Sequence, residues 1–173
     1  AEPLVARRFR REVDERTNAK GEVLRGLDPA EVIAIGNDFR AAGIESVAIC
    51  FLNSYLNPEN EKIALETFAA HFPEIWVTAS VSVLPEIKEY ERTSTTAVNA
   101  YVLPSLRHYL TRLEGGLHGM GVKAPLLVSN SNGGLSSAKI AQERPVFFIS
   151  SGRSAGVVGG ARLAARPARL GIR

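Results

Sequence analysis

The spacing of apolar and polar positions divides the first half of the chain into alternating strands and helices. Short apolar runs rich in β-branched residues predict buried strands, and apolar residues three or four positions apart predict helices. The predicted elements are, in order, a hairpin with arms at 5–13 and 22–27 around a turn at 18–21, a helix from 29 to 42, a strand at 46–52, a helix from 58 to 72 and a strand at 75–83. This order favours an α/β layer with right-handed crossovers between its strands.

Two of the predicted helices carry start signals. Asp28 and Asn57 are each followed by proline, which suits the first helical position because that position needs no amide hydrogen bond. In the second helix we expect Glu59 and Glu61 to favour the positive end of the helix dipole. The expected buried side of that helix consists of Ile63, Leu65, Phe68 and Phe72.

The pattern changes near residue 84, and we place a domain boundary there, between 1–84 and 85–173. A polar stretch leads into a long helical run that Pro104 should kink or divide. The expected elements are the polar stretch at 86–96, the helix at 97–117, a strand at 125–130, a glycine turn at 132–134, a helix at 138–143, a strand at 146–150 and a helix that begins within 151–155.

The composition is that of an ordinary folded protein. Apolar residues make up 45% and charged residues 23% of the 173 residues, close to the globular average and unlike disordered chains. The only cysteine, Cys50, cannot form an intrachain disulfide and no leader is recognisable, so we expect a cytoplasmic location. The longest apolar run, near 47–52, is far shorter than the roughly 20 residues that cross a bilayer, so no membrane segment is expected.

The net charge of +3 comes from the end of the chain. The last twelve residues contain four arginines and no acidic residue, so the first 161 residues carry 17 basic and 18 acidic side chains, a net charge of −1. A solvent-exposed helix face explains these arginines better than phosphate binding does, and we expect no nucleic-acid partner. The four residues are Arg162, Arg166, Arg169 and Arg173.

The string GRSAG at 152–156 has the G-x-S-x-G spacing of a hydrolase nucleophile turn and lies between an apolar run and a predicted helix. We reject that interpretation because the acid and the histidine follow the serine in that fold, and residues 155–173 contain no Asp, Glu or His. A metal site is not expected either, because His71, His108 and His118 are ten or more residues apart. Cys50 lies in an apolar run and is expected to be a small core residue.

The segment 150–160 leaves two interpretations open. Its small residues at a helix start could hold an anion or a phosphate through free amides and the helix dipole. Alternatively, its glycines leave one helix face without side chains, so that another segment can pack closely against it. We favour this interpretation for Gly156, Gly159 and Gly160. The segment has neither a P-loop ending nor a G-x-G-x-x-G pattern.

The polar segment 86–96 is the densest collection of hydrogen-bonding side chains in the sequence. A solvated helix entry with local ion pairs explains most of it. The threonines at 93, 95 and 96 argue against that explanation, because β-branched hydroxyl residues are poor choices for an exposed helix surface.

Four segments together resemble the hydantoinase A/5-oxoprolinase family, in order and with family-like spacing. They are SVAICFLNSYLNPENE (46–61), LPEIKEYERTSTTAVNAYVLPSL (84–106), PLLVSNSNGGLSSA (125–138) and SSGRSAGVVGGARLAA (150–165). The hairpin region at 11–24 is also similar, so the resemblance covers nearly the whole chain. It implies that 1–84 is the C-terminal part of the family's N-terminal region and that 85–173 is the start of its hydantoinase A domain.

The resemblance implies an α/β fold, a partial actin-like (ribonuclease H-like) ATPase fold with parallel or mixed sheet segments and flanking helices. The family consists of ATP-dependent cyclic-amide hydrolases, acting on hydantoins or 5-oxoproline, with relatives that are subunits of acetone and acetophenone carboxylases. Phosphorylation of an amide or enol oxygen by ATP is the implied activation. The implied cofactors of the full-length family are ATP and Mg.

This sequence departs from the family in lacking both Asp-Gly-Gly-Thr-type phosphate loops, and Arg153 replaces the family's usual proline. We therefore expect an inactive fragment that does not bind Mg·ATP tightly. By resemblance, the residues that line the substrate site or cleft are Glu89, Arg92, Thr95, Thr96, Asn99, Asn132, Gly133 and Gly134. Those at the helix start next to the nucleotide are Ser151, Gly152, Ala155 and Gly156.

Two functions remain open from the sequence. The chain is either a piece of a cyclic-amide hydrolase, completed by the rest of the large subunit or a second hydantoinase subunit, or a non-catalytic α/β module for assembly or interaction. The substrate of the full enzyme would be a small cyclic amide. Apolar edges of a partial sheet make self-association a further expectation.

Overall fold

The computed structural model describes residues 3–165 and has a mixed α/β fold. It divides into two compact units, Ala1–Pro104 and Ser105–Arg173, which are described separately. Three of the four C-terminal arginines, Arg166, Arg169 and Arg173, lie outside the described residues.

The predicted hairpin at the start of unit 1 is confirmed around its turn. Strands β1 (Arg16–Thr17) and β2 (Val23–Arg25) pair antiparallel, and the Asn18 side chain accepts the amides of Lys20 and Glu22 at 2.8 and 3.0 Å. Gly21 has a φ of +82°, which glycine adopts without strain. The predicted arm at 5–13 is wrong: it contains a 3₁₀ turn, η1 (Arg7–Phe9), whose backbone groups bond locally.

The centre of unit 1 is a parallel pair of strands, β3 (Ser46–Ile49) and β4 (Trp76–Ala79), joined through helix α2 (Glu59–His71). Both strands are shorter than predicted. The chain turns directly after β3, and after β4 it forms the single helical turn α3 (Ser80–Val83) instead of continuing as a strand. The α3 turn begins at Ser80 and Val81, whose hydroxyl and amide groups donate to the buried carboxyl group of Glu61. These two bonds draw the backbone out of the path of the strand.

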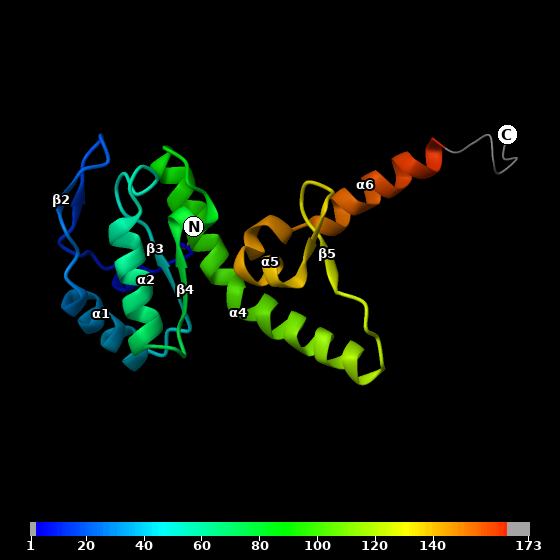
Figure 1. The fold of residues 1–173 in the computed structure, drawn as a ribbon, viewed down its shortest axis with the longest axis horizontal. Helices are drawn as coiled ribbons and strands as arrows, with labels where there is room; N and C mark the ends of the chain where they lie inside the picture. The colour runs from blue at the N-terminus through cyan, green and yellow to red at the C-terminus, as the bar shows by residue number, and fades with distance from the viewer. Residues whose placement is uncertain (1–2, 166–173) are drawn as a thin grey trace, which may run out of the picture. The chain divides into compact units, whose positions relative to one another are not determined.

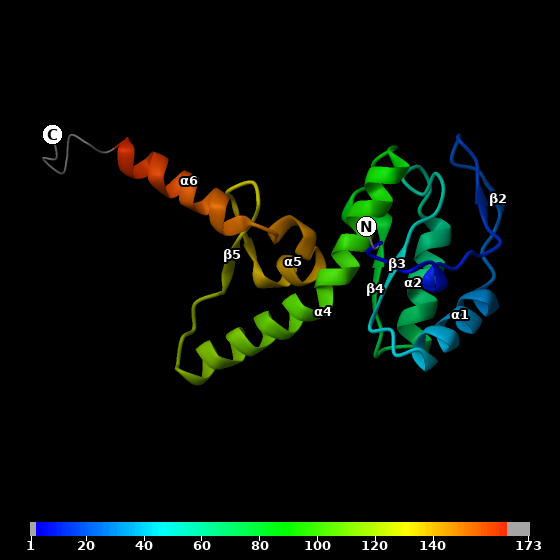
Figure 2. The ribbon, with the colours of Figure 1, turned by 180° about the vertical axis from the view of Figure 1, so that it is seen from behind.

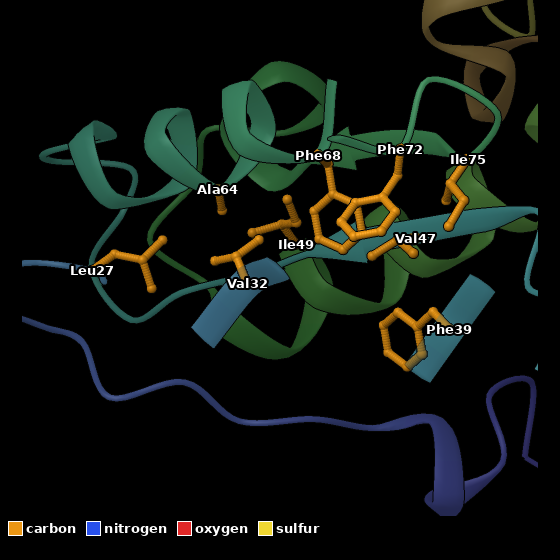
Figure 3. Close-up of a cluster of buried hydrophobic side chains, with 9 residues drawn as sticks. All are labelled: Leu27, Val32, Phe39, Val47, Ile49, Ala64, Phe68, Phe72 and Ile75. Atoms are coloured by element: carbon orange, nitrogen blue, oxygen red, sulfur yellow. The ribbon is translucent and has the colours of Figure 1, made fainter. Parts of the chain in front are cut away.

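Helix α1 (Pro29–Ala41) starts and ends as predicted. The Asp28 side chain accepts the Ala30 amide at 2.9 Å, Pro29 is the first helical residue, and Gly43 follows with a φ of +69°. α1 and α2 pack on each other and contribute to one apolar core with β3 (Figures 1 and 3). The buried members of this core are Leu27, Val32, Phe39, Val47, Ile49, Ala64, Phe68, Phe72 and Ile75.

Side chains alternate between the two faces of the β3–β4 pair, as the period of a strand requires. Val47 and Ile49 point into the core with α1 and α2, whereas Thr78 bonds Asn99 on the long helix α4 (Glu89–Gly119) at 3.4 Å. Figures 1 and 2 show β3 and β4 between α2 and the first half of α4. The pair is therefore covered on both faces, which explains its apolar sequence.

Helix α4 begins earlier than expected, because the polar segment forms its first turns. Pro104, which we expected to kink or divide the helical run, lies inside α4, and the boundary between the two units directly follows it. Within residues 3–165, no helix combines the length and apolar character needed to cross a membrane.

Unit 2 contains the hairpin β5 (Leu127–Ser129) and β6 (Leu135–Ser137), followed by α5 (Ala138–Glu143), η2 (Pro145–Phe148) and α6 (Ser151–Ala164). The short helix and the start of the last helix agree with the sequence analysis, and β6 was not foreseen. The predicted strand at 146–150 is wrong. Pro145 opens a 3₁₀ turn there, and Phe148 packs with Leu110 and Ala141 instead of entering a sheet.

We predict that Gly36→Ala destabilises unit 1. A Cβ at Gly36 would lie 2.2 Å from the Phe72 ring, and overpacking of this kind costs about 1–3 kcal/mol. Urea unfolding followed through Trp76, the only tryptophan, measures the change. Gly26→Ala is the matched control, since no atom lies within 4 Å of its Cβ position. Equal stability of the two variants would contradict the packing described for α1 and α2.

Candidate functional site

The residues identified by resemblance in unit 1 all lie on the first half of α4, and they differ in exposure. Arg92, Thr96 and Asn99 are fully buried at 0% exposure; their spacing of four and three places them on one helix face. Glu89 is exposed and Thr95 is half-buried. Within unit 1, three of the five side chains therefore face the protein interior.

The guanidinium group of Arg92 bonds mainly to backbone carbonyls. Its Nη2 donates to the Phe51 carbonyl at 2.7 Å and to Oε1 of Glu89 at 3.2 Å, and its Nη1 donates to the Glu86 carbonyl at 3.4 Å. The guanidinium carbon also lies 5.7 Å from the centre of the Tyr55 ring. The Nε atom has no hydrogen-bond partner among the described residues.

Glu61 is a second fully buried charged side chain, and it lies on the first turns of α2. Its Oε1 accepts the Phe51 amide at 2.9 Å and the Ser80 hydroxyl at 2.7 Å, and its Oε2 accepts the Val81 amide at 3.0 Å. The expectation that Glu61 acts as a helix-end charge overlooked this role. Its spacing to Ala64 and Phe68 on the buried face of α2 is the sequence signal that could have revealed it.

Cys50, which directly follows β3, is half-buried beside the same network. Burial raises the pKa of its thiol from the ordinary 9.0 to about 11, an effect that hydrogen bonding with Thr96 partly opposes. A thiol of this kind is protonated at neutral pH and is a poor nucleophile. From the sequence, Cys50 is expected to be a small core residue; in the structure it is half-buried and is not a member of the buried apolar core.

Three asparagines tie the β1–β2 hairpin to α2 and the preceding loop. Asn53 donates to the Thr17 carbonyl and Asn57 to the Gly21 carbonyl, both at 2.9 Å. Asn60, which is 2% exposed, accepts the Leu27 amide at 3.1 Å. The hairpin is thus positioned by side-chain bonds to its backbone and not by a wider sheet.

In unit 2, the glycine turn at 132–134 is shaped by amide side chains. Oδ1 of both Asn130 and Asn132 accepts the Gly134 amide at 2.9 Å. Gly133 has a φ of +86°, and a Cβ there would lie 2.8 Å from Val158. An open hollow of about 390 Å³ adjoins the turn, lined by Asn130, Ser131, Asn132, Ser136, Ile140, Arg144, Phe147 and Phe148.

The start of α6 places Ser151 and Ala155 half-buried and Gly152 and Gly156 exposed. Ser154, the serine of the G-x-S-x-G string, donates its hydroxyl to the Ser131 carbonyl at 2.6 Å, which is a structural contact. The close packing expected of the later glycines is not observed: no described atom lies within 4 Å of a Cβ built at Gly156, Gly159 or Gly160.

The described residues offer no cluster of protein ligands for a metal ion. Hard cations need oxygen ligands, usually from one or two carboxylates together with the phosphates. Within residues 3–165, no group of three or more His, Cys, Asp or Glu side chains is placed to hold a metal ion. The buried carboxyl group of Glu61 is already occupied by three donors of the protein.

Two family profiles match the chain in sequence order. Residues 1–72 match the hydantoinase/oxoprolinase N-terminal region, and residues 92–170 match hydantoinase/oxoprolinase. The caprolactamase subunit alpha of Pseudomonas jessenii is 37% identical over 152 residues, which are 88% of this chain and 22% of that relative.

Two solved structures have a similar fold. The ATP-dependent caprolactamase from Pseudomonas jessenii superposes with a TM-score of 0.83 at 36% identity, covering 89% of this chain and 22% of that one. Nucleotide-free acetone carboxylase gives a TM-score of 0.81 at 32% identity, with 95% and 24% covered. The chain therefore spans less than a quarter of the length of these proteins.

We predict that Glu61→Ala lowers the free energy of unfolding of unit 1 by at least about 3 kcal/mol. Two amides and one hydroxyl would lose their acceptor, at about 1–3 kcal/mol for each buried group. Urea unfolding followed by Trp76 fluorescence is the measurement. Glu66→Ala, at an exposed position of the same helix, should change the value by no more than about 0.5 kcal/mol. A loss from Glu61→Ala as small as the control's would refute the buried acceptor role.

We predict that alkylation of Cys50 by iodoacetamide at pH 8 is about a hundredfold slower in the folded chain than in urea. The shift of the thiol pKa from 9.0 to about 11 reduces the thiolate fraction by that factor. Because the folded state binds this proton more tightly, the associated stability is present below pH 9 and is lost as the pH rises towards 11. Equal rates in the folded and unfolded chains would contradict this environment.

Proposed function

Because this chain belongs to the hydantoinase/oxoprolinase family, we propose that it forms part of an ATP-dependent enzyme that opens cyclic amides. The observation that carries the proposal is the similarity to ATP-dependent caprolactamase, at 36% identity and a TM-score of 0.83 over 89% of the chain. Its name indicates a cyclic-amide substrate. The hydantoinase/oxoprolinase description of the matching profiles supports the same substrate class.

In this proposal the chain forms part of an actin-like fold, and residues 1–84 and 85–173 belong to two successive sequence domains. The parallel β3–β4 pair, covered by helices on both faces, is consistent with such a fold. Exposed Glu89 and half-buried Thr95 would face the substrate. The buried residues of the same helix, Arg92, Thr96 and Asn99, would anchor α4 to the rest of unit 1. In unit 2, the turn at 132–134 and the start of α6 are proposed, by resemblance, as ligand contacts in the complete protein.

We assign no step of the ATP reaction to residues of this chain, since no cluster of metal ligands is found among the described residues. The chain would act only within a longer or multi-subunit protein. The similarity to a protein named subunit alpha supports assembly with other subunits. The non-catalytic module is not favoured, because the two solved structures described above are both of enzymes.

Carboxylation of a ketone is a second candidate reaction, which the similarity to acetone carboxylase favours. Amides and ketones both carry a poorly reactive carbonyl group that phosphorylation of its oxygen would activate. We propose cyclic-amide opening as the first candidate because the caprolactamase match has the higher identity and TM-score.

A chimera tests the proposal. We predict that Pseudomonas jessenii caprolactamase, with the matching 22% of its alpha subunit replaced by this chain, retains ATP-dependent opening of caprolactam, measured by amino-acid release and by ADP formation. The purified 173-residue chain, as the control, should hydrolyse no ATP above the buffer rate. A folded, assembled chimera without ATP-dependent ring opening would contradict the proposal, and so would ATP turnover by the chain alone.

A further inference from the structure

The backbone of Phe51 is held at both of its polar groups by buried charged side chains. Its amide donates to Glu61 at 2.9 Å and its carbonyl accepts from Arg92 at 2.7 Å. Both side chains are 0% exposed. Phe51 is also the first residue of the loop 51–56, which begins one residue after Cys50 at the carboxyl end of β3.

Stability alone is a poor explanation for Arg92. Burying a guanidinium group costs several kcal/mol, and well-packed apolar residues of similar volume often give equal or higher stability. Its one ion-pair partner, Glu89, has a side chain that is 47% exposed, and its Nε has no partner among the described residues. What Arg92 provides that an apolar residue could not is a set of directed bonds to backbone carbonyls, of which the bond to Phe51 is the shortest.

We propose that Arg92 is a positioning residue that fixes the loop 51–56 through the Phe51 carbonyl and does not itself contact a ligand. The loop is ordered further by Ser54, whose hydroxyl donates to the same carbonyl at 3.0 Å, and by Asn53, whose side chain donates to the Thr17 carbonyl at 2.9 Å. Full burial of Arg92 excludes direct contact with a ligand at the surface of unit 1.

The loop lies where open α/β sheets bind their ligands, outside the carboxyl ends of the strands. The side chains of Leu52 and Leu56 in this loop are 42% and 48% exposed. The first residue of the loop, Phe51, is held by the buried side chains of Glu61 and Arg92. A rigid loop with exposed apolar side chains suits an uncharged ring such as a cyclic amide. This choice of ligand rests on the proposed function; the positioning role of Arg92 does not.

Amide hydrogen exchange of the 173-residue chain tests the positioning role. In Arg92→Met, we expect the amides of Leu56 and Asn57, which bond the Asn53 carbonyl, to exchange at least tenfold faster, while the amides of the β3–β4 ladder change less than twofold. Arg92→Lys, which keeps a donor, should restore most of the protection. Glu89→Gln, which changes only the exposed partner, is the matched control and should leave the loop unaffected.

Two results would overturn the inference: unchanged loop exchange in Arg92→Met, or a parallel rise in the loop and the ladder, which would show a general structural role. If Arg92→Met does not fold, Arg92→Gln, whose shorter side chain cannot make the same bond to the Phe51 carbonyl, replaces it in the same comparison. In the chimera, the variant that removes the donor, Arg92→Met, should raise the KM for caprolactam at least fivefold with a smaller change in kcat, and Arg92→Lys should keep most of the parent's KM. An unchanged KM would reject the loop as a ligand contact. An inactive parent chimera would reject the proposed function and leave the exchange result standing.

Discussion

The fold of unit 1 depends on one constraint: the chain must turn sharply at the end of β3, and the backbone groups exposed by that turn must find partners inside the protein. Glu61 and Arg92 supply those partners from two different helices. Because Glu61 also accepts from Ser80 and Val81, the same carboxyl group ends β4 and starts α3. The hydrogen-bond network around Phe51 thus links the ends of the two parallel strands to helices α2, α3 and α4.

This arrangement joins the two sequence regions that the family profiles separate. Phe51 and Glu61 belong to the N-terminal region, and Arg92 is the first residue matched by the second profile. Within unit 1 these regions share buried hydrogen bonds, so they fold as one body up to Pro104. The positions that the resemblance marked on α4 include the residues that make this connection.

Local signals in the sequence predicted much of the fold. The cap at Asp28, the stop at Gly43 and the α5 segment depend on neighbouring residues, and they agree with the structure. The ends of β3 and β4 and the turn at 145–148 could not be predicted, because distant partners decide them. For the candidate site, the resemblance identified Arg92 and Asn99, but only tertiary packing shows that they are buried. Glu61 lies in the first turn of α2 as expected, but its buried acceptor role was missed because dipole reasoning considers the helix alone.

The central claim is that Glu61 and Arg92 act on the same residue from opposite sides, although no direct ion pair joins them among the contacts described. A double-mutant cycle of Glu61→Ala and Arg92→Met, with unfolding free energies measured through Trp76 fluorescence, tests this most directly. The account predicts that the double variant loses at least about 1 kcal/mol less than the sum of the single losses, because either change already frees Phe51. Additive losses, within about 0.5 kcal/mol, would contradict it.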